Sequence, residues 1–108
     1  MIDRIILKNG NVQYNFWEDA YDYPLGNLWV RFGIGQNRNV IGFILNMVTV
    51  TEFRKRGICT KLHDELLKDC NIIICLDGSK DGGEEFLLSF GYKYNKELDL
   101  WYYKKGEK

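Results

Sequence analysis

The chain has 108 residues, enough for one domain with a sizeable hydrophobic core but not for two such cores. Hydrophobic residues make up 45% and aromatic residues 15%, which excludes an intrinsically disordered chain. Fifteen basic and fifteen acidic side chains cancel, so we expect neither nucleic acid nor a membrane surface as a partner. No apolar run approaches the roughly 18 residues of a membrane span, and the first residues lack the apolar core of a leader, so we expect a cytoplasmic protein.

The first half of the chain predicts strands joined by short turns. Apolar and β-branched runs, bounded by Gly and Asn, predict strands over residues 3–7, 12–17, 28–34 and 40–50. Asn-Gly and Gly-Gln pairs between them are typical of tight turns. Residues 18–27 are polar and aromatic and contain the single proline, Pro24, so we expect a loop there.

The second half alternates between helices and strands. Apolar residues recur every four positions from Ile58 to Cys70, which predicts an amphipathic helix over residues 60–69. Residues 72–76 are continuously apolar, a pattern typical of a strand that is covered on both faces. A short helix is expected over residues 82–89. The predicted antiparallel pair that closes the chain comprises residues 92–94 and 98–103.

These elements predict a single α/β domain over residues 1–108. We expect a mixed, mostly antiparallel central sheet of about six or seven strands with helices on its faces. The connection from residues 40–50 through the helix to residues 72–76 predicts a right-handed parallel β-α-β unit.

A basic loop precedes the first predicted helix and is the strongest functional signal. Arg54, Lys55 and Arg56 are followed by Gly57, and the helix begins at once. A strand, a glycine loop and a helix N-terminus together present backbone N–H groups to a phosphate. We therefore predict a phosphorylated ligand here, although the residues alone also allow a solvated basic turn.

The loop resembles the pyrophosphate-binding motif of the GCN5-related N-acetyltransferase (GNAT) family, in which Arg or Gln is followed by x-x-Gly-x-Gly or Ala. Arg54 and Gly57 match this motif, while Cys59 stands where the family has Gly or Ala. Residues 51–54 are similar to the family's Pro-Glu-Tyr-Arg entry into the loop, and residues 83–92 to its second signature. The resemblance covers residues 40–104, and the short N-terminal half is similar to small virus-encoded acetyltransferases.

This resemblance implies acetyl-CoA as the cofactor and acetyl transfer to a primary amine, for which a protein lysine is one candidate. It also implies that the family's N-terminal helices are reduced or absent, because residues 8–27 cannot hold both. The backbone of the long strand would pair with the pantetheine arm and stabilise the oxyanion near Thr49. The residues that the resemblance assigns to the cofactor are Met47, Val48, Thr49, Arg54, Lys55, Arg56, Gly57, Ile58, Cys59 and Thr60.

The catalytic groups depart from the family pattern. Leu87 occupies the position of the tyrosine that commonly protonates the departing thiolate, and the long strand carries no carboxylate. Glu52 and Asp77, which follow neighbouring strands, are the candidate bases, although each could instead be a turn or capping residue. These departures leave open a second hypothesis, a catalytically degenerate binding or inhibitory module with the same fold.

Other polar and aromatic residues receive simpler interpretations. The three cysteines predict reduced, buried thiols. Their spacing around His63 matches no familiar zinc pattern, so we expect no metal and interpret His63 as a partly exposed helix residue. The strand over residues 98–103 could pair across a homodimer. Residues that could line an acceptor cleft are Tyr14, Trp17, Tyr21, Tyr23 and Trp29.

Overall fold

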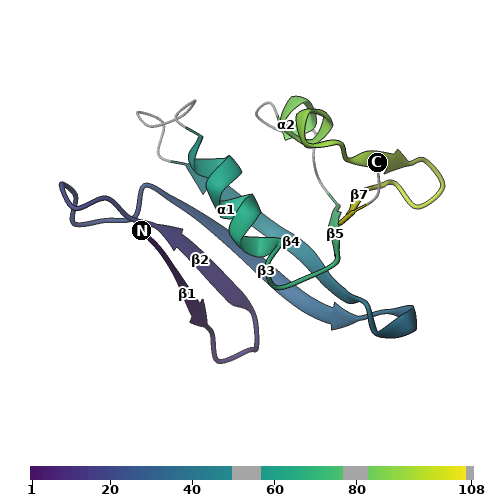
Figure 1. Cartoon of the computed structure of the whole chain (residues 1–108), viewed down its shortest axis with the longest axis horizontal. Coiled ribbons are helices and arrows are strands. Elements are labelled where there is room, and N and C mark those ends of the chain that lie inside the picture. Colours follow the sequence, from purple (N-terminus) through teal and green to yellow (C-terminus); the bar gives the residue numbers. More distant parts are fainter. Residues whose placement is uncertain (50–56, 77–82, 107–108) are drawn as a thin grey trace.

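The computed structural model describes residues 1–49, 57–76 and 83–106 of the chain. Its first four strands pair consecutively as antiparallel neighbours (Figure 1), as the tight turns before β2 and β4 predict. The strands are β1 (Ile2–Ile6), β2 (Val12–Phe16), β3 (Gly26–Ile34) and β4 (Val40–Thr49). A short 3-10 turn, η1 (Gln36–Arg38), joins β3 to β4.

The second half of the chain extends the same sheet. Helix α1 (Ile58–Leu66) leads to β5 (Ile72–Cys75), which pairs in parallel with β4. Helix α2 (Gly83–Phe90) leads to β6 (Lys93–Asn95), and β7 (Leu100–Lys104) then inserts between β5 and β6. The seven-stranded sheet has the order β1-β2-β3-β4-β5-β7-β6, which confirms the prediction of a mixed, mostly antiparallel sheet with one parallel pair.

Both helices pack on one face of the sheet, so the expectation of helices on both faces is wrong. Helix α1 lies against β2, β3 and β4, and its His63 ring contacts Phe90 at the end of α2. The reason is topological. The two helical crossovers advance in the same direction across the sheet, and connections of the same hand then lie on the same face.

The hydrophobic core lies between this face and α1. Alternate residues of the strands point into it, and the largest fully buried side chains are Tyr14, Leu25, Leu28, Val30, Leu62, His63, Leu66 and Ile73. Helix α1 begins at Ile58, two residues earlier than predicted, because Gly57 adopts a left-handed conformation and serves as the N-cap. Neither α1 nor α2 is long and apolar enough to cross a membrane.

The last long strand is an inner strand of the sheet. The strand predicted over residues 98–103 is β7, and β7 pairs with β5 on one side and with β6 on the other. Most of its backbone is therefore already paired within this chain. The edges of the described sheet are β1 and β6.

Candidate functional site

Strand β4 extends beyond the end of its parallel partner, β5. It pairs with β5 only from Ile41 to Ile44, whereas its pairing with β3 continues to Thr49. Figure 1 shows the two strands diverging beyond this point, with β4 continuing beneath α1. On the β5 side, the backbone of residues 45–49 is therefore left with no strand partner among the described residues, and it can pair with an extended ligand.

A β-bulge marks the point of divergence. Trp29 pairs with Asn46 and Val30 pairs with Ile44, so Leu45 is an extra residue on β4. A bulge bends the strand that carries it and increases its local twist. The bend falls at the last residue that pairs with β5, which accounts for the separation of the two strands.

The start of α1 faces the free end of β4. Gly57 has φ 77° and ψ 13°, and the helix follows without a side-chain cap. The N–H groups of Ile58, Cys59 and Thr60 have no carbonyl partner within the helix, because they belong to its first turn. The Cys59 Sγ lies 3.0 Å from the Thr49 Oγ1, so these amides and the open edge of β4 meet at one place. Such an arrangement favours an extended ligand that ends in an anionic group.

Gly26 positions these two elements, and our sequence analysis missed it. A Cβ at Gly26 would lie 2.7 Å from the Ile58 Cγ2 and 3.1 Å from the Val48 carbonyl oxygen. Only glycine therefore lets α1 approach the end of β4 this closely. The polar and aromatic composition of residues 18–27, with Pro24 among them, predicts a loop that includes residue 26. The signal that could have revealed it is the alternation of buried Leu28 and Val30, which continues back to Gly26.

Comparison with known proteins rests on structure alone, since no protein-family model and no curated protein matches the sequence. Arabidopsis thaliana NAA60 in complex with a bisubstrate analogue matches with a TM-score of 0.71 at 13% identity, over 90% of this chain and 77% of that chain. An acetyltransferase of the GNAT family from Staphylococcus aureus matches with a TM-score of 0.70 at 14% identity, over 87% of this chain and 67% of that chain. This chain has the GNAT fold. A chain of the NatC complex bound to Gag peptide and CoA gives 0.60 at 16% identity, over 80% of this chain but only 58% of its own length.

Within this GNAT fold, five of the predicted cofactor residues fall at the junction of β4 and α1. Thr49 ends β4, and Gly57, Ile58, Cys59 and Thr60 form the start of α1. Thr60 does not cap the helix, because Gly57 is the N-cap and no side chain bonds the free amides there. Its side chain is exposed instead.

The remaining predicted site residues divide into two groups. Met47 packs against the core, whereas Val48 is 44% exposed and points to the other face of the sheet. The other five, namely Glu52, Arg54, Lys55, Arg56 and Asp77, lie outside the described residues.

The position of the GNAT tyrosine holds a core residue. Leu87 is 3% exposed and belongs to the hydrophobic core, so it offers no proton donor. Tyr92, five residues later, is also buried, and burial raises the pKa of its hydroxyl. A buried phenol with a raised pKa gives up its proton less readily than an exposed one, so Tyr92 is a poor general acid.

His63 is a structural residue, and the expectation of partial exposure is wrong. It is completely buried, with Nε2 2.6 Å from the Tyr92 hydroxyl and its ring 4.1 Å from the Phe90 ring. Burial lowers the pKa of His63 to about 4, against a smaller opposing effect of Asp64. The imidazole is therefore neutral near pH 7 and takes part in the packing of α1 against the residues that follow α2.

The cysteines and the expected acceptor aromatics also have defined places. Cys70 and Cys75 are buried and Cys59 is half-buried, and all three are free thiols. Within residues 1–49, 57–76 and 83–106, no three His, Cys, Asp or Glu side chains gather as metal ligands would. Tyr14 is fully buried and donates to Asp69 at 2.6 Å, so it cannot line an open cleft.

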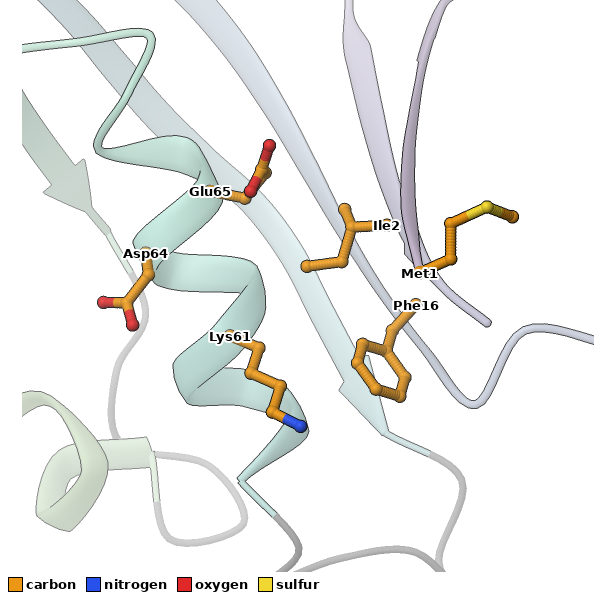
Figure 2. A pocket seen from close by; sticks show the side chains of 6 residues that line it. All are labelled: Met1, Ile2, Phe16, Lys61, Asp64 and Glu65. Atoms are coloured by element: carbon orange, nitrogen blue, oxygen red, sulfur yellow. The ribbon is translucent and has the colours of Figure 1, made fainter. Parts of the chain in front are cut away.

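A groove separates α1 from the N-terminal strands. Figure 2 shows its lining, which comes from the start of the chain, β2 and the outer face of α1. The Lys61 Nζ lies 5.3 Å from the centre of the Phe16 ring, a cation–π arrangement. Lys61 extends toward β2, so its charge stabilises the local packing of α1 against that strand.

Proposed function

We propose that this protein is an acyl-CoA-dependent N-acetyltransferase that transfers an acetyl group to a primary amine. One observation supports this proposal: the unpaired edge of β4 lies beside the start of α1, where Gly57 is the N-cap. Neighbours of the same fold support it, since their structures contain CoA, acetyl-CoA or a bisubstrate analogue.

The described residues fit such a cofactor. The diphosphate would accept hydrogen bonds from the amides of residues 58–60, while the pantetheine arm would pair with the backbone of Met47, Val48 and Thr49. Arg54, Lys55 and Arg56 would add positive charge on the same loop. Acetyl-CoA supplies the thioester, and a β4 amide near Thr49 would stabilise the negative charge that develops on its carbonyl oxygen.

The acceptor in this proposal is a protein or peptide amine, with a lysine side chain as one candidate. The N-terminal half of the chain consists of strands and turns, so no α-helix of residues 1–49 narrows access to the end of β4. One neighbour holds a Gag peptide together with CoA. An acceptor ammonium must lose a proton before it can react, because its reference pKa is near 10.4. Glu52 and Asp77 follow β4 and β5 in the sequence and are our candidates for that base.

A paired substitution tests the cofactor site. Gly57→Glu and Gly10→Glu each place a glutamate at an open glycine of positive φ, 77° and 87° respectively. Both strain the backbone, but only the first puts a carboxylate at the start of α1. By calorimetry we expect the parent and Gly10→Glu to bind acetyl-CoA, and Gly57→Glu to bind it at least about tenfold more weakly. Equal binding by the two variants would overturn the proposed site.

The buried Leu87 favours a second function, a module that binds the cofactor without transferring the acetyl group. Incubation of the protein with isotopically labelled acetyl-CoA and a cell lysate, followed by mass spectrometry of acetyl-lysine, separates the two. Labelled lysines above the level of the Gly57→Glu control support the enzyme. Cofactor binding without any labelled amine supports the module.

A further inference from the structure

The face of the sheet opposite α1 and α2 carries an apolar strip. Residues paired across the strands share a face, and on this face the paired positions of β4 and β5, together with Tyr102 of β7, are large and apolar. The strip consists of Ile41, Phe43, Ile72, Ile74 and Tyr102. All five are half-buried, and none belongs to the hydrophobic core or packs against it.

The sequence of β5 indicates that this strip is covered in the functional state. Ile72, Ile73 and Ile74 are all apolar, which is typical of a strand with both faces buried. Ile73 faces α1 and is fully buried, whereas Ile72 and Ile74 point to the opposite face and are only half-buried. The two described helices both pack on the Ile73 side, so they leave the strip uncovered.

Basic side chains border the apolar strip on both sides. Arg31 of β3 pairs with Phe43, and Lys93 of β6 pairs with Tyr102, so one row across five strands begins and ends with a cation. Lys104 pairs with Ile72 in the next row. All three basic side chains are exposed.

We propose that this face docks an amphipathic helix of a partner protein, with an apolar stripe flanked by acidic residues. The apolar strip spans two strand spacings, about 10 Å, which matches the width of one α-helix. The basic row extends about 19 Å in total, so glutamates on both flanks of such a helix would reach cations. This proposal does not depend on the acetyltransferase proposal.

Two other occupants fit the surface less well. A second copy of the chain, docked face to face, would bring Arg31, Lys93 and Lys104 against the same cations. Single-stranded nucleic acid needs exposed rings on which bases stack, but Ile74 lies between Phe43 and Tyr102 in the row. The acidic helix satisfies both the apolar centre and the basic borders.

Isoleucine methyl groups report directly on this docking. The probe is a synthetic helical peptide of about 20 residues with leucines at i, i+3, i+4 and i+7 and glutamates beside them. The control peptide keeps the leucines and replaces the glutamates with lysines. In methyl NMR spectra of the full chain, we expect the acidic peptide to shift Ile41, Ile72 and Ile74. The methyl signals of Ile58 and Ile73, which are buried on the other face, should stay in place.

Charge reversal completes the test. At low salt we expect the acidic peptide to bind at least about tenfold more tightly than the basic one, with a smaller difference at high salt. Lys93→Glu combined with Lys104→Glu should reverse that preference, while unchanged Ile58 and Ile73 signals show that the variant is folded. Equal affinities for the two peptides, or shifts confined to Ile58 and Ile73, overturn the proposal. The proposal is also overturned if the acidic peptide leaves the methyl signals of the strip unchanged while a single-stranded oligonucleotide shifts them. The same holds if dimerisation, measured by ultracentrifugation, shifts them instead.

Discussion

Replacing Gly26 with alanine should push the start of α1 away from β4. The added Cβ would sit 2.7 Å from the Ile58 Cγ2, against a normal carbon–carbon contact of about 3.5–4.0 Å. One partner must therefore move by about 1 Å. Ile58 is β-branched and stiff, and the next nearest atom, the Val48 carbonyl oxygen at 3.1 Å, belongs to the backbone of β4. Overpacking of this kind costs about 1–3 kcal/mol of unfolding free energy.

Thermal unfolding measures this cost, at about 4–8 °C of Tm for each kcal/mol in a domain of this size. Gly33→Ala is the matched control on the same strand, because its Cβ would make only an ordinary 3.4 Å contact with Phe43. We expect Gly33→Ala to be neutral or slightly stabilising, since alanine loses less backbone entropy than glycine in a strand.

A double-mutant cycle isolates the contact itself. Ile58→Ala removes the Cγ2 with which the new Cβ would collide, so its own cost of about 2–5 kcal/mol should shrink in the Gly26→Ala background. Costs that add to within about 0.5 kcal/mol would show that the two positions do not touch, and would refute the reasoning.

Four further outcomes follow from the same structure. Iodoacetamide should modify Cys59 much faster than the two buried thiols, and acetyl-CoA should slow that reaction if it binds beside the residue. Because the folded pKa of His63, about 4, lies below its unfolded value of about 6.5, stability should fall as the pH drops through that window. Urea unfolding of the parent chain at several pH values should show this loss of stability, roughly 3 kcal/mol in total. The same measurement on His63→Gln should show no such loss. Tyr14→Phe should cost about 1.5–3 kcal/mol by urea unfolding, because its hydroxyl donates to the Asp69 carboxylate. Leu87→Tyr should lower Tm without raising acetyl transfer, since the larger ring must enter a filled core.

The strand order was predictable wherever alternation and turn residues agree. The buried residues of β3 alternate with more exposed ones from Gly26 to Arg31, and Gly10 in the Asn-Gly turn before β2 has a positive φ. The placement of both helices on one face was not predictable from the run at β5. The apolar run Ile72–Cys75 predicts that both faces of β5 are buried, but it does not show whether the same chain buries both of them.

The candidate site was predictable in part. The loop motif correctly located Gly57 at the start of α1, because a glycine before an amphipathic run is a local signal. The bulge at Leu45 depends on contacts between distant segments, and no local pattern encodes it. The alternation of Leu28 and Val30 extends the strand back to Gly26, but the contact of Gly26 with Ile58 depends on a later part of the chain. His63 was misjudged because its partners, Phe90 and Tyr92, come from a later part of the chain.

The extra residue at Leu45 reverses the parity of β4. Before it, the even-numbered Gly42 and Ile44 point toward the helices; after it, the odd-numbered Met47 and Thr49 do so. Deleting that single residue would join the Val30–Ile44 and Trp29–Asn46 pairs into a regular ladder. Met47 and Thr49 would stay on the helix side, but the bend that separates β4 from β5 would be lost. Tolerance at this position should therefore be asymmetric: exchanges of the exposed side chain are harmless, while deletion of the residue straightens β4 and closes the gap to β5.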